Sequence, residues 1–326
     1  MSPAPKTSTT VETLTRIWES VLQTSPINPD DNFFDLGGDS ALALQLFNEI
    51  ANHHDRELPP VMIYHAPTIS ALAGILDEPT TPRFPPLALL KDGKKDPPVF
   101  ITHGLGGSLI DFYHVVKHME TLRAVYGMQG KGIDGVEEPF DRVEDMAQYS
   151  LDAVRKIQPH GPYLLVGFSL GGLVTFEMAR RLRASQEKVA LLAMLDSYPH
   201  MRYLSFGQRA LLKVQQRQRS LWKKLSYRAV QPLPGDGPLS PVVQRCRESA
   251  YRALENYQPS FYPGKITFVR AAISTTFSSN PAAVWGHLAE DFAVDTVPGD
   301  HLGIMTTHYA ELAALISRYL RESLPA

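Results

Sequence analysis

The sequence has very little cysteine and no long apolar segment. Cys246 is the only cysteine among its 326 residues, so no internal disulfide can form, and nothing indicates an oxidising compartment. Apolar runs such as VALLAML at 189–195 are far too short to cross a bilayer. The first residues, MSPAPKTSTT, lack the apolar core of a secretory signal peptide. We therefore expect a cytoplasmic protein without a membrane partner.

Charge is nearly balanced overall but unevenly distributed. The chain has 32 Lys and Arg against 34 Asp and Glu, and its net charge of −2 indicates no particular partner. Residues 1–78 hold three Lys or Arg against eleven Asp or Glu, whereas the remainder holds 29 against 23. Either the two parts attract each other, or a small acidic domain simply stays in solution.

The composition divides the chain into three parts. Residues 1–78 predict a small all-α four-helix bundle, in which Ser40 begins a second helix and Thr68 caps a third over 68–76. Residues 77–98 contain six prolines and few helix or strand patterns, so we expect a semi-extended linker over 79–97. Residues 98–326 alternate short buried strands with amphipathic helices, which indicates a mostly parallel sheet covered by helices on both faces.

The alternation in the third part places its elements. We expect strands at 99–102, 124–128, 163–166, 189–195 and 266–270. We expect helices at about 108–119, 144–157, 172–185, 281–289 and 303–323. The stretch 200–262 has a helical pattern and interrupts the alternation, which predicts an insertion between two strands.

A reactive serine is predicted where an expected strand runs directly into an expected helix. Gly167-Phe168-Ser169-Leu170-Gly171 follows the strand sequence YLLV. Glycines beside Ser169 allow the tight, strained turn that exposes a nucleophilic hydroxyl, and the Leu170 amide at the helix start can stabilise an oxyanion. The alternative is a glycine-rich turn whose serine has no role.

A serine nucleophile needs a base and an acid that orients it, in the order Ser, Asp or Glu, His for this type of turn. Asp196 ends the apolar strand LLAML, and the next strand, KITFVRAAIS, contains no carboxylate. His301 lies on a glycine-containing turn before the last helix, whereas Asp300 is too close to it in sequence to orient its ring. We predict a triad of Ser169, Asp196 and His301, although a histidine that only packs the loop is the alternative for His301.

A second oxyanion donor is expected from the loop after the first strand, His103-Gly104-Leu105-Gly106-Gly107, and we assign it to the Leu105 amide. His103 itself is predicted to be structural. The loop lacks the third glycine of a dinucleotide-binding loop. His114 and His118 lack a third ligand, so we expect surface histidines and no metal site.

The sequence DNFFDLGGDSALALQLFNEI, residues 31–50, closely resembles the phosphopantetheine attachment motif of carrier domains in nonribosomal peptide and related polyketide synthetases. The resemblance implies that a phosphopantetheinyl transferase adds 4′-phosphopantetheine to Ser40. A serine that only caps the helix is the alternative. Asp39 departs from the pattern, because carrier domains just upstream of thioesterases often have histidine there.

Residues 98–326 resemble the terminal (type I) thioesterases of the same secondary-metabolite assembly lines, which have the α/β-hydrolase fold, and 200–262 matches their variable lid. The resemblance implies that an acyl or peptidyl chain passes from the Ser40 arm to Ser169 and is released by hydrolysis, cyclisation or transfer. Upstream synthetase modules or an acyl-activating enzyme would supply the chain, and the carrier would dock on the thioesterase. A non-catalytic cargo-holding module and a stand-alone carboxylesterase with a fused acidic domain are the alternatives.

The expected lid is strongly basic. Residues 201–235 contain eight Lys or Arg and no Asp or Glu. This basic side would receive the acidic carrier or the phosphate of its arm, or it is simply a solvated face. We expect no nucleic-acid partner, because the whole chain is acidic and carries a complete hydrolase set.

Overall fold

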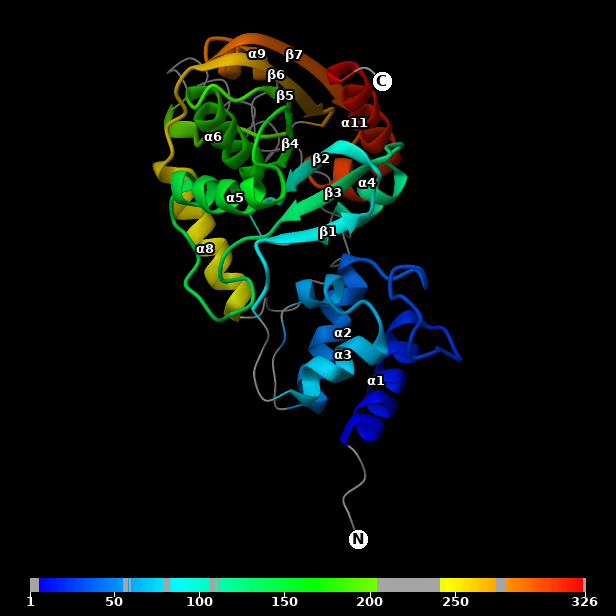
Figure 1. Cartoon of the computed structure of the whole chain (residues 1–326). Helices are drawn as coiled ribbons and strands as arrows, with labels where there is room; N and C mark the ends of the chain where they lie inside the picture. The colour runs from blue at the N-terminus through cyan, green and yellow to red at the C-terminus, as the bar shows by residue number, and fades with distance from the viewer. Residues whose placement is uncertain are drawn as a thin grey trace, which may run out of the picture. The chain divides into compact units, whose positions relative to one another are not determined.

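The computed structural model describes residues 6–54, 58, 60–78, 83–105, 109–110, 112–203, 241–273 and 280–324 (Figure 1). These residues form two compact units, one built mainly on the chain up to Pro85 and the other on most of the chain from Pro86 onward. No helix within the described ranges is both long and apolar enough to span a bilayer.

The first unit is a small helical bundle. The fully buried ring of Trp18 packs edge-on against Phe33, with 5.3 Å between ring centroids. Thr68 accepts a hydrogen bond from the Ala71 amide at 3.2 Å and so caps the last helix, as predicted. The predicted four-helix bundle is confirmed, although one helix is a short 3-10 segment. The elements are α1 (Lys6–Leu22), α2 (Ser40–His53), the 3-10 helix η1 (Pro60–Tyr64) and α3 (Ile69–Asp77).

The second unit is built on a seven-stranded sheet with strand order β1-β3-β2-β4-β5-β6-β7. Only the β1–β3 pair is antiparallel, and all other neighbours are parallel. The central strand β4 is buried along its whole length, as a parallel strand covered on both faces should be. The strands are β1 (Leu87–Lys91), β2 (Lys95–Thr102), β3 (Arg123–Met128), β4 (Tyr163–Phe168), β5 (Val189–Leu195), β6 (Tyr262–Ala271) and β7 (Ala289–Val297).

All five expected strands are present, and the structure adds two at the edges of the sheet. The last residue of the expected helix 281–289, Ala289, is instead the first residue of β7. The strand β1 lies inside the expected linker 79–97, and β2 also begins there, so the prediction of an irregular linker is wrong for residues 87–91 and 95–97. The sequence LALLK contains no β-branched or aromatic residue and follows two prolines, so its pattern is weak. Pairing with β3, which the local sequence does not reveal, makes it a strand.

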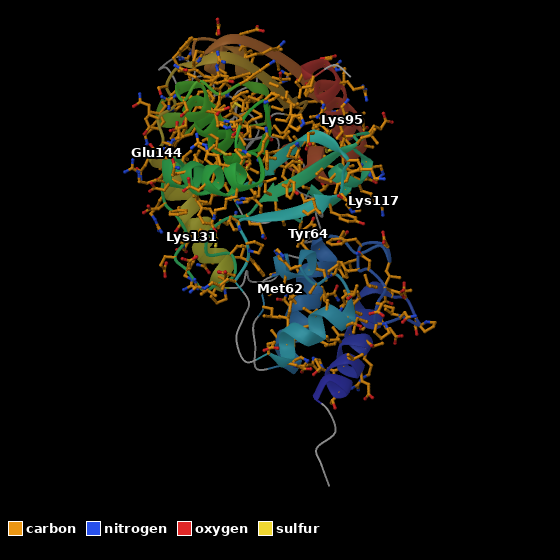
Figure 2. All side chains as sticks on the ribbon, in the orientation of Figure 1. Met62, Tyr64, Lys95, Lys117, Lys131 and Glu144 are labelled. Atoms are coloured by element: carbon orange, nitrogen blue, oxygen red, sulfur yellow. The ribbon has the colours of Figure 1, made fainter. Side chains whose placement is uncertain are left out.

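Helices cover the sheet on both sides, and side chains fill the space between the layers (Figures 1 and 2). α4 packs against α11, and α5 packs against α6. α6 is buried along most of its length, including its first residue, Leu170. The helices are α4 (Phe112–His118), α5 (Val143–Ile157), α6 (Leu170–Ala184), η2 (Met201–Tyr203), α8 (Pro241–Asn256), α9 (Pro281–Trp285), α10 (Gly303–Thr306) and α11 (Tyr309–Ser323).

Most of the expected lid, including seven of the eight basic residues at 201–235, lies outside the described residues. Within 200–262 the structure describes η2, α8 and the start of β6. The predicted basic docking face therefore stays a prediction.

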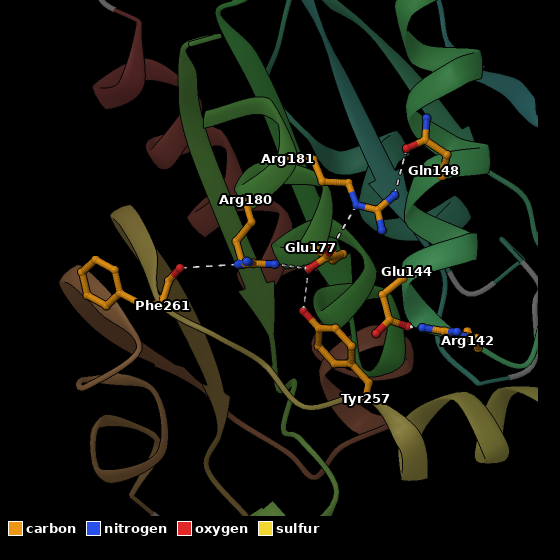
Figure 3. Close-up of polar contacts among 8 residues, drawn as sticks. All are labelled: Arg142, Glu144, Gln148, Glu177, Arg180, Arg181, Tyr257 and Phe261. Carbon is orange, nitrogen blue, oxygen red and sulfur yellow. Dashed lines mark hydrogen bonds and ion pairs between the residues drawn. The ribbon is translucent and has the colours of Figure 1, made fainter. Parts of the chain in front are cut away.

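A buried carboxylate ties α6 to the segment after α8 (Figure 3). Glu177 on α6 accepts hydrogen bonds from Arg180 at 2.6 Å, from Arg181 at 2.9 Å and from the Tyr257 hydroxyl at 3.1 Å. Arg181 also donates to Gln148 on α5 at 2.8 Å. Burial, together with the Glu177 carboxylate, raises the pKa of Tyr257, so its hydroxyl remains a donor. These contacts hold the C-terminal end of α8 against α6.

Candidate active site

Ser169 occupies a strained turn between β4 and α6. Its backbone has φ 54° and ψ −120°, a conformation that few non-glycine residues adopt. The turn is possible because glycines surround it: a Cβ on Gly171 would lie 2.5 Å from the Thr102 carbonyl oxygen, and one on Gly167 would lie 2.5 Å from the Thr175 hydroxyl. The sharp strand-to-helix turn predicted from G-x-S-x-G is therefore present.

Three side chains far apart in the sequence meet at this turn. His301 Nδ1 lies 2.8 Å from Asp196 Oδ2, and His301 Nε2 lies 3.0 Å from Ser169 Oγ. The other carboxylate oxygen of Asp196 accepts a hydrogen bond from the Ala271 amide at 3.2 Å. The imidazole also stacks on Phe168, with 4.7 Å between ring centroids. The Asp196 carboxylate therefore fixes one edge of the His301 ring, and the Phe168 ring packs against its face.

The burial of these groups suits proton transfer. The side chain of Asp196 is 7% exposed, whereas that of His301 is 20% exposed. With Nδ1–H donating to Asp196, the lone pair of Nε2 is directed at the Ser169 hydroxyl and can accept its proton. Asp300 does not compete for the histidine, because its Oδ1 accepts a hydrogen bond from the Gly303 amide at 2.8 Å.

The loop after β2 lies against the serine. A Cβ on Gly104 would lie 3.4 Å from Ser169 Cβ and 3.2 Å from the Phe168 ring. His103 Nδ1 lies 2.7 Å from the Gly104 carbonyl oxygen, and burial lowers the pKa of His103. A neutral His103 that donates to this carbonyl supports the loop, in line with its predicted structural role. Leu105 is described, whereas Gly106 and Gly107 of the predicted oxyanion loop lie outside the described residues.

A cavity is lined by the two residues predicted to donate the oxyanion amides, Leu105 and Leu170. Met128, Val174 and Ala250, all almost fully buried, also line it. No sequence pattern indicates this cavity, because its wall comes from separate segments between β2 and α8.

The histidine pair on α4 packs against an aromatic ring. The imidazoles of His114 and His118 lie 5.0 Å and 4.9 Å from the ring centroid of Tyr309. Among the described residues, no group of three or more His, Cys, Asp or Glu side chains could hold a metal ion.

The predicted attachment serine begins a helix whose cap is another residue. Ser40 is the first residue of α2, and Asp39 accepts a hydrogen bond from the Leu42 amide at 2.8 Å. Asp39 is therefore the N-cap, which removes the alternative that Ser40 serves only as a helix cap. Before it, Gly37 has φ +92°, and a Cβ on Gly38 would overlap the Phe33 ring. This tight loop and the positive end of α2 fit a serine that carries a phosphodiester.

The sheet and the Ser, His and Asp arrangement are those of α/β-hydrolase enzymes with a serine nucleophile. More narrowly, the chain belongs to the thioesterase family: residues 97–320 match the model of the thioesterase domain, and residues 12–76 match that of the phosphopantetheine attachment site. The chain thus joins a phosphopantetheine attachment domain to a thioesterase domain.

Curated relatives are much longer proteins. The chain is 36% identical over 191 residues to malpibaldin synthetase of Mortierella alpina, which covers 56% of this chain and 3% of that protein. It is 37% identical over 190 residues to a dimodular nonribosomal peptide synthase of Bacillus subtilis, which covers 58% of this chain and 8% of that protein. The chain therefore spans only a small part of these synthetases.

Solved structures share the fold at lower identity. The four-domain nonribosomal peptide synthetase holo-AB3403, bound to AMP and glycine, matches with a TM-score of 0.62 and 22% identity, over 99% of this chain and 26% of that one. The NocB thioesterase domain, in covalent complex with a fluorophosphonate nocardicin G analogue, matches with a TM-score of 0.52 and 22% identity, over 71% of this chain and 96% of that one. Both support the fold alone.

Proposed function

We propose that Ser169, His301 and Asp196 form a catalytic triad that takes an acyl or peptidyl group from a thioester and then releases it. The observation that carries this proposal is the position of the His301 ring, 2.8 Å from Asp196 and 3.0 Å from Ser169. A serine hydroxyl is a weak nucleophile unless a base removes its proton, and an oriented imidazole supplies that base.

In the first half-reaction, Ser169 Oγ attacks the thioester carbonyl while His301 Nε2 accepts the hydroxyl proton. The amides of Leu105 and Leu170 donate to the carbonyl oxygen as it becomes an anion, and Asp196 stabilises the imidazolium. The carbon–sulfur bond then breaks, and His301 returns its proton to the leaving thiolate. The products are a free thiol and an acyl ester on Ser169.

In the second half-reaction, another nucleophile attacks the carbonyl of the Ser169 ester, and His301 accepts its proton. The bond between Ser169 Oγ and the acyl carbon then breaks, and His301 returns the proton to the serine oxygen. Water gives a free acid, and we propose hydrolysis as the outcome. A hydroxyl or amine of the acyl chain itself would give a lactone or lactam by the same proton transfers. The favoured outcome depends on which nucleophile reaches the ester.

We propose Ser40 as the attachment residue of 4′-phosphopantetheine. When bound, this group carries the acyl chain as a thioester. Ser40 supplies the esterified oxygen, and the N-terminus of α2 favours the negative phosphodiester. The proposed partners are a phosphopantetheinyl transferase, upstream synthetase modules or an acyl-activating enzyme, and the thioesterase domain of the same chain.

We propose a carrier domain over 1–78 and a thioesterase domain that reaches the end of the sequence. The strand β1 pairs with β3 inside the sheet, so we place the start of the thioesterase domain near Pro86 and not at residue 98. The proposed linker shortens to about 79–85.

Mass spectrometry of the intact full chain tests the proposal. After brief incubation with an N-acetylcysteamine acyl thioester, we expect an added acyl mass that is absent in Ser169→Ala and disappears as product forms. A wild-type chain that binds the thioester but never gains this mass would be the non-catalytic holding module. Treatment with coenzyme A and a phosphopantetheinyl transferase should add one arm to the wild type and none to Ser40→Ala. If Ser40→Ala still releases the natural product at the normal rate, the chain is a stand-alone carboxylesterase.

A further inference from the structure

The residues whose amides are proposed to hold the carbonyl oxygen, Leu105 and Leu170, form part of the wall of the cavity beside the triad. Its lining includes His103, Leu105 and Leu170, and the loop that carries the first two lies against Ser169. A carbonyl placed for attack, with its oxygen toward the Leu105 and Leu170 amides, therefore has its carbon at one end of this cavity.

The walls of the cavity are mostly apolar. Met128, Val174 and Ala250 line the cavity, and each is at most 5% solvent-exposed. Among the residues that the structure describes, no Asp or Glu lines the cavity. The one lysine of the wall, Lys131, has its ammonium 4.9 Å from the ring centroid of Phe140, where a cation–π contact stabilises it. Such walls favour an uncharged apolar group, because a charged one would lose its hydration without a carboxylate or a free cation to replace it.

The chemistry of the first half-reaction determines which part of the substrate enters the cavity. His301 must return its proton to the leaving sulfur, so the thiol portion leaves on the side of the imidazole. His301 is absent from the cavity wall, whereas Leu105 and Leu170 are part of it. The remaining substituent of the carbonyl carbon, the acyl group, therefore points away from His301 and toward the cavity.

We infer that this cavity receives the apolar part of the acyl group next to the scissile carbonyl, so that the domain selects thioesters of compact apolar acyl groups over charged ones. The inference rests on the proposed function of the triad. Ala250 on α8 and Val174 on α6 both line the cavity, so the sizes of their side chains limit how large a group fits.

Selectivity between matched thioesters tests the inference. The full chain, without the prosthetic arm, is assayed with the N-acetylcysteamine thioesters of acetyl, 3-phenylpropanoyl and succinyl groups. We expect kcat/KM to favour 3-phenylpropanoyl over succinyl in the wild type. Ala250→Leu narrows the cavity and should lower the ratio of kcat/KM for 3-phenylpropanoyl to that for acetyl by about tenfold or more, the scale of a few methylenes in an apolar pocket.

A widening variant gives a change of opposite sign, which misfolding cannot produce. Val174→Ala should raise the ratio of kcat/KM for 3-(2-naphthyl)propanoyl to that for 3-phenylpropanoyl. The matched control is Val116→Ala on α4, an equally buried valine outside the cavity wall, which should leave both ratios unchanged. Ratios unaffected by Ala250→Leu and Val174→Ala, or a preference for succinyl, would overturn the inference.

Two further outcomes separate the possible failures. If Ala250→Leu instead changes the preference between pantetheine and N-acetylcysteamine thioesters of one acyl group, the cavity binds the thiol arm, and the inference is wrong while the triad stands. If no thioester acylates Ser169 in the wild type, the proposed function itself fails, and the inference fails with it.

Discussion

Replacement of Gly171 by alanine should displace the oxyanion loop and leave the triad side chains in place. The new Cβ would lie 2.5 Å from the Thr102 carbonyl oxygen and closer still to that of His103. Ordinary contact begins at 3.4 Å, so the backbone must retreat by about 0.9 Å at Thr102 and by more at His103. His103 is two residues before Leu105, and the retreat moves the predicted amide donor with it. Because the obstacle is backbone, no side-chain rotation relieves it.

A misplacement of about 1 Å at a reacting group costs about a hundredfold in rate, and overpacking of this kind costs about 1–3 kcal/mol of stability. We expect Gly171→Ala to lower kcat/KM for an N-acetylcysteamine thioester by about 10²-fold while the chain stays folded by circular dichroism. The matched control is Gly74→Ala in α3, where a Cβ meets nothing within 4 Å. A Gly171→Ala chain with kcat/KM within about twofold of wild type would refute this account of the loop.

Three further results are expected. Tyr257→Phe should lower the free energy of unfolding of the thioesterase domain by about 1.5–3 kcal/mol in urea, because a buried hydrogen bond to the Glu177 carboxylate is lost. Tyr203→Phe should cost much less, because the Tyr203 hydroxyl donates to a carbonyl in an exposed setting. Equal losses in the two variants would contradict this account. Because the pKa of His103 is lowered in the folded protein, the unfolded chain binds more protons below about pH 6.5. The free energy of unfolding should therefore decrease as the pH is lowered below that value. Thermal unfolding should show a smaller decrease for His103→Gln. Asp196→Asn should lower kcat about 10⁴-fold in a thioester assay without loss of fold, because the imidazole loses its orienting carboxylate; a loss below about tenfold would exclude this role.

The parts of the site that the sequence predicts are those whose signal is local. G-x-S-x-G after an apolar strand requires one backbone geometry, and the structure has it at Ser169. Asp196 could be placed because it directly follows a buried strand and the next strand offers no carboxylate. His301 could be placed because a glycine turn precedes the last helix. For each residue, a few neighbours in sequence determine where the side chain lies relative to the sheet.

The parts that the sequence does not predict depend on partners far along the chain. Glu177 belongs to the sequence FEMARRLRA, which looks like an ordinary charged helix surface, yet the residue is only 5% exposed. Its burial becomes clear only when Tyr257, 80 residues later, packs beside it. β1 was missed for the same reason, because its strand conformation depends on β3. The cavity has a wall of scattered residues, and no window of sequence contains enough of them to be recognised.

Backbone hydrogen bonds of the sheet hold the two strained residues of the site, Ser169 and Asp196, in place. Ser169 and Asp196 both have positive φ, 54° and 43°, and each such residue costs about 1–3 kcal/mol unless its surroundings enforce it. The surroundings are visible in the backbone: the Ser169 amide donates to Leu195 at 2.9 Å, and the Asp196 amide donates to Val269 at 2.7 Å. The parallel ladder from β4 through β5 to β6 thus continues into the strained residues and fixes both before any substrate binds. Disruption of the β5–β6 pairing should therefore act first on Asp196, and it should reach Ser169 through the Leu195 carbonyl and through the orientation of His301.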